Sequence, residues 1–312
     1  MKIESFPRKL FLFRNNLCMF AQTQNELHNM KHMSILAVSL LALVACTPEK
    51  KQEADYSQYV NPMIGTDFTG NTYPGAQVPF GMVQLSPDNG LPGWDRISGY
   101  FYPDTTIAGF SHTHLSGTGA GDLYDISFMP VTRPYKEAPA PLGIYSTFSH
   151  NDEAASAGYY RVLLKDYNIN VELTATERCG IQRYTFPEAE ASVFLNLKKA
   201  MNWDFTLDSK IEVVDSTTIR GYRLSQGWSP LQHVYFETRF SKPFVACHMD
   251  TTSIVTKEKG WIGTAYVARF DFNTKKDEEI LVTTGISGVS MEGAGKNLRA
   301  EAPKDDFDYY QA

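Results

Sequence analysis

A glycine-rich stretch from residue 92 to residue 125 holds most of the side chains in this chain that could do chemistry. Glycine allows positive φ and lets the backbone come close to a ligand. Polar and aromatic side chains on a tightly turned loop are typical of a site for a polar ligand. The alternative is that the glycines form an ordinary turn and the aromatic rings fill a core. The groups in question belong to Trp94, Asp95, Asp104, His112, His114, Asp122 and Asp125.

The four aspartates are the only clustered acids near this stretch, and paired carboxyl groups are what glycoside hydrolysis requires. Retaining enzymes place the two groups about 5 to 5.5 Å apart, and inverting enzymes about 6.5 to 9.5 Å apart. That separation depends on the tertiary structure. For Asp95, which follows Trp94, we predict a role in orienting a ligand hydroxyl group or in capping a turn.

His112 and His114 are two positions apart, so on an extended segment they would point to the same side. Such a pair could bind zinc with Asp122 as a third ligand, but zinc takes three or four protein ligands and no further His or Cys lies nearby. We therefore predict no metal site here. Hydrogen bonding to a substrate or across an interface is favoured, because neutral imidazole both donates and accepts. A Ser111–His112 nucleophile pair is disfavoured, since adjacent residues face opposite ways.

The aromatic residues Trp94, Tyr100 and Tyr102 suit a sugar ligand, because the C–H face of a pyranose packs on an aromatic ring. The alternative is that these rings fill the hydrophobic core, where aromatic residues dominate burial. The remaining tryptophans lie outside the glycine-rich stretch, and we predict core or sheet-edge positions for them: Trp203, Trp228 and Trp261.

The elements that must position these residues are β-strands. Residues 169–176 alternate apolar and polar side chains, as a half-buried strand requires. Pro, Gly and Asn recur through residues 59–80 and exclude long helices there. No amphipathic helix of twelve or more residues is evident before residue 300. We therefore predict an all-β fold, a large sandwich of antiparallel sheets. Its further strands are predicted at 183–187, 192–197, 210–214, 218–224, 233–240, 244–248, 263–271 and 280–286.

The N-terminus resembles a bacterial lipoprotein signal. Residues 30–46 begin with a basic segment, continue with an apolar run too short to span a bilayer, and end in Leu-Val-Ala-Cys. Cleavage before Cys46 would leave this cysteine to be acylated and would tether the protein to the cell envelope, on the periplasmic face or the outer membrane. The alternative is a buried core segment. Residues 1–29 fit no signal peptide and are interpreted as a gene-model extension, and residues 47–58 as a flexible tether.

The net charge of the chain argues against one class of partner, and its cysteines leave one question open. The 312-residue chain has a net charge of −6, and without residues 1–46, which hold five Lys/Arg and two Asp/Glu, it is near −9. An acidic chain without basic clusters argues against nucleic acid as a partner but does not oppose a neutral glycan. Cys179 and Cys247 either form a disulfide or remain free and buried; their spacing decides neither.

The glycine-rich stretch also carries a resemblance. Residues 109–119 read Gly-Phe-Ser-His-Thr-His-Leu-Ser-Gly-Thr-Gly, which is similar to the signature of the N-terminal domain of glycoside hydrolase family 92, the bacterial exo-α-mannosidases. Further motifs of this family follow in the same order along the chain, at residues 59–66, 73–82, 158–162, 172–178 and 289–292.

The resemblance implies a supersandwich-like domain over residues 59–300 and the start of a linker helix at 301–312, where acids suit a helix N-terminus. In the family a helical (α/α)-barrel follows, so the resemblance marks this chain as a fragment. It implies an inverting, calcium-dependent α-mannosidase of the α-1,2 type whose catalytic groups and calcium lie in the barrel. It therefore implies no catalytic residue, cofactor or independent activity in this chain.

The partners implied by the resemblance and the signal are a mannose-containing glycan, the barrel and a membrane reached through the lipid anchor. The alternatives are a non-catalytic glycan-binding lipoprotein or a scaffold that pairs with a separately encoded barrel. In each case the residues expected to contact the sugar are Trp94, Asp95, His112, His114 and Asp122.

Overall fold

The structure, a computed structural model, describes residues 55–117, 119–140, 142–198, 202–256 and 261–311. Residues from Tyr56 onward form one compact unit. The predicted gene-model extension, the signal segment with Cys46, and residues 47–54 of the tether lie outside the described residues and stay predictions. No helix in the described ranges is long and apolar enough to cross a membrane.

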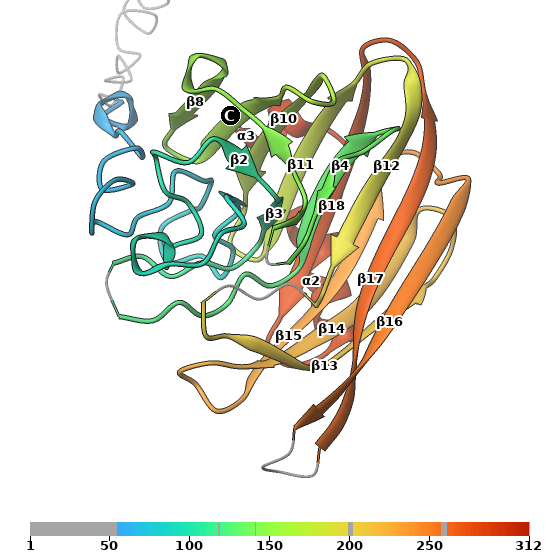
Figure 1. The fold of residues 1–312 in the computed structure, drawn as a ribbon. Helices are drawn as coiled ribbons and strands as arrows, with labels where there is room; N and C mark the ends of the chain where they lie inside the picture. Colours follow the sequence, from blue (N-terminus) through green and yellow to red (C-terminus); the bar gives the residue numbers. More distant parts are fainter. Residues whose placement is uncertain (1–54, 118, 141, 199–201, 257–260, 312) are drawn as a thin grey trace, which may run out of the picture. The chain divides into compact units, whose positions relative to one another are not determined.

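Six strands form one sheet of the unit, in the order β1-β3-β4-β12-β17-β16, and all of its pairings are antiparallel (Figure 1). Two of its strands, β1 and β3, flank or belong to the glycine-rich stretch. The strand bounds are β1 Ser86–Asp88, β3 Gly109–Ser111, β4 Ser127–Thr132, β12 Ala189–Asn196, β16 Ala246–Thr256 and β17 Trp261–Thr274.

Eight strands form the second sheet, in the order β13-β14-β15-β18-β11-β10-β9-β8, again antiparallel. The bounds are β8 Glu153–Ser156, β9 Tyr159–Leu164, β10 Ile169–Ala175, β11 Cys179–Phe186, β13 Phe205–Val213, β14 Thr218–Gln226, β15 Gln232–Phe240 and β18 Glu278–Ser287. Two short pairs complete the strands: β2 Thr106–Ile107 with β7 Ser146–Thr147, and β5 Glu137–Ala138 with β6 Gly143–Ile144. The 3-10 helices are η1 Ser57–Tyr59, η2 Trp94–Arg96 and η3 His150–Asp152.

The two sheets face each other across one hydrophobic core. Phe240 of the eight-stranded sheet meets Phe128 of the other sheet edge-to-face at 6.5 Å, and Phe270 and Phe272 at 5.2 and 5.8 Å. The alternating pattern of residues 169–176 places Val171 and its alternate neighbours in this core. The predicted antiparallel β-sandwich is confirmed.

The outer face of the eight-stranded sheet is covered by a helix that begins earlier than the sequence predicts. Helix α2 spans Met291–Glu301 and packs on β18 and β15. Its N-cap is Ser290, whose Oγ accepts a hydrogen bond from the backbone N–H of Gly293 at 3.0 Å. Two glycines in its first two turns lower the helix propensity of this segment, so the helix is not predicted from the sequence. Gly285 of β18 allows α2 to pack closely on the sheet, because a Cβ at this position would lie only 2.6 Å from the carbonyl oxygen of Ala294.

The acidic segment near the end of the chain, for which a helix starting at residue 301 is expected, contains a short helix that begins at residue 307. Helix α3 spans Phe307–Gln311, and Asp306 Oδ1 accepts a hydrogen bond from the backbone N–H of Tyr309 at 3.1 Å. Phe307 joins a second apolar cluster with Cys179 of β11 and Leu298 of α2. Helices α2 and α3 are therefore part of the compact unit.

Cys179 and Cys247, whose pairing the sequence leaves open, are both free. Burial raises the pKa of the Cys179 thiol to about 12, so this thiol stays protonated at neutral pH. It behaves as a small apolar side chain of the second cluster.

Candidate functional site

The glycine-rich stretch forms a long connection that enters from β1, contains η2, β2 and β3, and leaves into β4. Its first exposed feature is Trp94 in η2, which is 54% exposed and stacks on Trp203, itself 41% exposed. The ring centroids are 6.2 Å apart and the planes differ by 28°. The backbone N–H of Gly93 donates to Asn202 Oδ1 at 2.7 Å, which ties η2 to the segment that carries Trp203.

Asp95 lies beside this tryptophan pair and is partly exposed. Within the described residues its carboxylate accepts no hydrogen bond, so it does not cap a turn. Its neighbour Arg96 is engaged elsewhere, because the guanidinium forms two hydrogen bonds to Asp104, at 2.6 and 2.5 Å. Those hydrogen bonds raise the pKa of Arg96. Asp95 is thus available to a ligand, whereas Asp104 is bound to its own loop.

The two tyrosines of the stretch have different positions. Tyr100 is fully buried and its hydroxyl donates to the carboxylate of Glu153 at 2.9 Å, so the core interpretation holds for this ring. Tyr102 is 39% exposed and stacks on His150 with centroids 3.9 Å apart. Only Tyr102 is accessible to a sugar.

Both histidines of the signature lie inside the domain. His112 is fully buried with Nδ1 2.7 Å from the carbonyl oxygen of Ile126, and burial lowers its pKa to about 4. It is therefore a neutral imidazole that donates through Nδ1. Its Nε2 has no partner in the described residues and packs against Gly180, where a Cβ would approach to 2.7 Å.

His114 joins β1 to β3. Its Nδ1 is 2.7 Å from the carbonyl oxygen of Gln84, and its Nε2 is 2.8 Å from Asp88 Oδ1 and 3.1 Å from Ser111 Oγ. A hydrolytic triad needs the serine and the aspartate on opposite ring nitrogens, whereas here both lie at Nε2 and are fully buried. Neither signature histidine is exposed at the surface of this chain. Both stabilise the loop through internal hydrogen bonds, so the predicted direct contact with the sugar is not possible in this conformation.

Asp122 is also nearly buried and links two loops. Its Oδ2 accepts hydrogen bonds from the backbone N–H of Trp228 at 2.7 Å and from Gln232 Nε2 at 3.1 Å. The residues between β14 and β15 are thereby fixed against the glycine-rich stretch. Trp228 itself is 84% exposed. The predicted core or edge position is therefore wrong for Trp228. Trp203 is not a core residue but lies two residues before β13, the edge strand of the eight-stranded sheet. The side chain of Trp261 lies outside the described residues.

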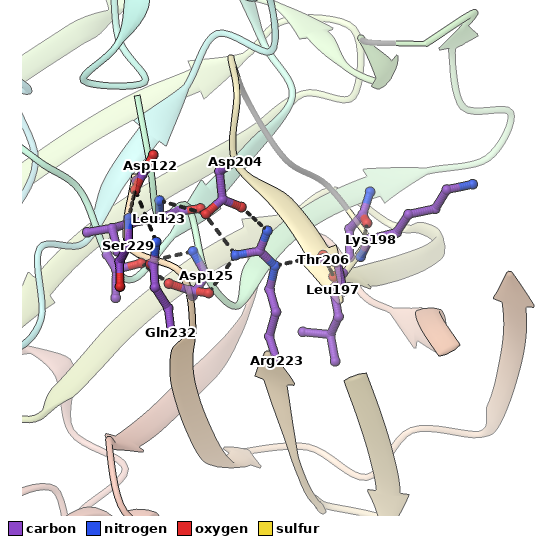
Figure 2. A network of polar contacts seen from close by, with 12 residues as sticks. Asp122, Leu123, Asp125, Leu197, Lys198, Asp204, Thr206, Arg223, Ser229 and Gln232 are labelled. Carbon is purple, nitrogen blue, oxygen red and sulfur yellow. Dashed lines mark hydrogen bonds and ion pairs between the residues drawn. The ribbon is translucent and has the colours of Figure 1, made fainter. Parts of the chain in front are cut away.

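The end of the stretch is anchored by a buried ionic network around Arg223 of β14 (Figure 2). Arg223 Nη1 donates to Asp125 Oδ1 at 2.7 Å, Nη2 donates to Asp204, and Nε donates to Thr206 Oγ1 at 3.0 Å. Burial alone would lower the pKa of Arg223, but the two carboxylates outweigh it and raise that pKa. Asp125 also accepts a hydrogen bond from Thr113 Oγ1 at 2.7 Å, which ties the middle of the signature to this network.

The acids of the stretch therefore do not assemble a pair for hydrolysis. Asp104, Asp122 and Asp125 are each held by internal donors, which leaves Asp95 as the accessible carboxylate among the four. Hydrolysis by acid and base needs two carboxyl groups at the scissile bond. In the described part of the chain no group of three or more His, Cys, Asp or Glu side chains could hold a metal ion.

Comparison with known proteins decides the family. Residues 59–287 match the glycosyl hydrolase family 92 N-terminal domain. The chain belongs to this family. A family 92 α-mannosidase from Bacteroides thetaiotaomicron, solved in complex with mannoimidazole, is 37% identical, with a TM-score of 0.73 over 82% of this chain and 35% of its own. A family 92 inverting mannosidase from the same species is 26% identical, with a TM-score of 0.69 over 84% of this chain and 35% of its own.

A curated relative is an uncharacterized secreted glycosidase from Arthroderma benhamiae, 26% identical over 172 residues, which are 52% of this chain and 21% of the relative. This family 92 chain thus spans about a third of the solved mannosidases and about a fifth of the fungal protein.

Sequence reasoning missed the residues that arrive from β14 and its neighbours: Asn202, Trp203, Arg223 and Trp228. The one signal for Trp228 is Gln-Gly-Trp-Ser-Pro at 226–230, a turn sequence in which a tryptophan has no strand to bury it.

Proposed function

We propose that this chain is the substrate-binding N-terminal part of an α-mannosidase that acts on mannose-containing glycans. The observation that carries the proposal is the exposed, stacked pair of Trp94 and Trp203 with the open carboxylate of Asp95 beside it. The C–H face of a mannose would pack on the indole of Trp94 while Asp95 accepts hydrogen bonds from its hydroxyl groups. The mannoimidazole complex of a family 92 relative supports a mannose-like ligand.

We further propose that the reaction inverts configuration on α-1,2-linked mannose, and that the proton-transferring carboxyl groups and calcium belong to an (α/α)-barrel partner. The inverting family 92 relative supports the stereochemistry. The internal engagement of three of the four loop aspartates supports a chain without hydrolytic activity of its own. In this arrangement the sandwich supplies one wall of the sugar pocket.

The test is binding of methyl α-mannoside to the full chain, measured by NMR titration. We expect Trp94→Ala to weaken binding by about tenfold, which corresponds to about 1.4 kcal/mol, because the stacking surface is removed. Tyr309→Ala is the matched control, since Tyr309 is an exposed aromatic residue of α3. Equal affinity of wild type and Trp94→Ala would contradict the proposed site.

For the location of the protein, we propose lipid attachment through Cys46 in the cell envelope. The support is the apolar run that ends in Leu-Val-Ala-Cys and the secreted glycosidase among the relatives.

A further inference from the structure

Two arginine side chains converge on one carboxylate on the outer face of the six-stranded sheet. Arg269 and Asp271 of β17 alternate with the core residue Phe270, so their side chains point away from the core. Arg133 directly follows β4, which is separated from β17 by β12. The strand order therefore brings together charged groups that lie far apart in the sequence.

Asp271 already accepts several hydrogen bonds. Arg133 Nη2 and Arg269 Nε donate to it at 2.9 Å each. Ser192 Oγ donates at 2.7 Å, and His248 Nε2 lies 3.1 Å from Oδ2. Burial alone would raise the pKa of Asp271, but the hydrogen bonds from Ser192 and the two arginines outweigh it and lower that pKa. The carboxylate is therefore ionised at neutral pH.

The positive charge of this cluster exceeds its negative charge. Arginine stays protonated in proteins, so two guanidinium groups share the single charge of Asp271. Glu190 also approaches Arg133, but its side chain is 73% exposed and its carboxylate lies 3.7 Å from Arg133 Nη1, beyond hydrogen-bond distance. A guanidinium has five N–H donors, and the described part of the chain engages one donor of Arg133 in a hydrogen bond. Donors therefore remain for a further anion.

An open hollow of about 490 Å³ adjoins these donors and is lined by Arg133, Pro134, Tyr135 and Arg269. The ring of Tyr135 packs edge-to-face on Phe194, with centroids 5.2 Å apart, which fixes its position. Its hydroxyl is an acceptor for the Arg269 guanidinium, so its own proton can be donated to a ligand. None of the described residues that line the hollow is an acid.

This lining favours an anion with more than two acceptor oxygens. Arginine binds carboxylates and phosphates through two parallel N–H···O bonds. A carboxylate offers two oxygens in one plane, whereas a phosphate group offers three acceptor oxygens and a charge of about −1.5 to −2. Three donor side chains and a surplus of positive charge match the phosphate group. A neutral sugar leaves that charge without a partner, and the guanidinium groups repel a cation.

We propose that the hollow between Arg133 and Arg269 binds a phosphate group, either free phosphate or the phosphate monoester of a lipid headgroup. The two guanidinium groups bind its oxygens, and the Tyr135 hydroxyl donates to a third. Asp271 holds both guanidinium groups in place, so little conformational entropy is lost on binding. The inference is independent of the proposed function, because its residues belong to β17 and to the segment after β4 and not to the glycine-rich stretch.

The experiment is a titration of the full chain with inorganic phosphate at constant ionic strength, followed by NMR or calorimetry. We expect saturable binding that Arg133→Met weakens by about tenfold and Tyr135→Phe by about threefold, since each removes hydrogen-bond donors to a charged ligand. Arg299→Met is the control, because Arg299 is exposed and pairs with Glu237 away from the hollow. This variant should bind phosphate as tightly as wild type.

A second titration separates the two sources of phosphate. Dihexanoyl phosphatidic acid is a soluble lipid whose headgroup is a phosphate monoester. Tighter binding of this lipid than of inorganic phosphate, with the same loss in Arg133→Met, supports a lipid headgroup as the ligand. Equal or weaker binding of the lipid supports free phosphate.

Two results would overturn the site: a phosphate titration that does not saturate, or equal affinity of wild type, Arg133→Met and Arg299→Met. Thermal melting without phosphate shows whether each variant folds. We expect Arg133→Met to fold, because Asp271 keeps its contacts with Ser192 and Arg269. If it does not fold, Tyr135→Phe decides the question, since it removes a single hydroxyl group, and unchanged affinity in this variant overturns the site.

Discussion

At the scale of the residue, the exposed side chain of Phe80 belongs to a backbone position with an unfavourable positive φ. Phe80 is fully exposed with φ at 62°, in a turn where Gly81 N–H donates to the carbonyl oxygen of Val78 at 3.0 Å. Pro79 occupies the preceding turn position, and such turns favour Gly or Asn where φ is positive. A left-handed conformation costs a bulky residue about 1–2 kcal/mol, and an exposed phenyl ring recovers none of that cost by burial.

We therefore predict that Phe80→Asn stabilises the domain by about 0.5–1 kcal/mol, since Asn tolerates positive φ. Chemical denaturation measures the free energy of unfolding. Val289→Asn is the control, because Val289 is exposed but has ordinary φ, and it should give no gain. A loss of stability in Phe80→Asn would mean that the phenyl ring packs in solution.

At the scale of the element, Arg223 joins β14 to the end of the glycine-rich stretch. Removing its charge leaves Asp125 and Asp204 buried without a cation, and breaking such a pair costs about 3–5 kcal/mol. We predict that Arg223→Met lowers the free energy of unfolding by this amount at pH 7. Arg133→Met is the control, because the Arg133 side chain is 37% exposed and Asp271 keeps its contacts with Ser192 and Arg269 without it. The loss should be less than about 1 kcal/mol.

The same variant has a predicted pH dependence. Burial already raises the pKa of Asp204 in the intact network, and loss of the guanidinium raises it further. A carboxyl group whose folded pKa lies above its unfolded pKa stabilises the fold at low pH, and this contribution is lost as the pH rises through the folded pKa. The deficit of Arg223→Met should therefore shrink between pH 7 and about pH 5. A deficit that grows on acidification would show that the two aspartates are not the cause.

At the scale of the whole molecule, the sandwich is proposed to act at a membrane surface through its N-terminal lipid. We predict that Cys46→Ser moves the protein from the detergent-extracted membrane fraction to the soluble fraction, because acylation requires this thiol. Cys247→Ser is the matched control, since Cys247 is a free cysteine of β16. Fractionation followed by immunoblotting reads out both variants, and unchanged partitioning of Cys46→Ser would exclude the anchor.

The sequence alone determined the local elements. Period-two alternation predicts strands such as β10 and β14, because strand side chains alternate between faces whatever the partner strand is. The glycine-rich signature identifies the loop that carries Trp94 and Asp95, and its order among further motifs identifies the family. Helix α2 escaped prediction because its glycines weaken the local signal, while packing on β18 and β15 stabilises it.

Only the tertiary structure decided which residues form the surface of the site. The sequence predicts that His112 and His114 contact the sugar, but both rings are buried in the structure. The ring nitrogens form hydrogen bonds to residues distant in sequence, Ile126 for His112 and Gln84 and Asp88 for His114, which hold the rings inside the domain. Conversely, Trp203 stacks on Trp94 and the backbone of Trp228 donates to Asp122, although both tryptophans lie more than 75 residues downstream of the glycine-rich stretch. Local sequence patterns do not predict such contacts, because the contacts depend on how the strands pair and how the sheets pack.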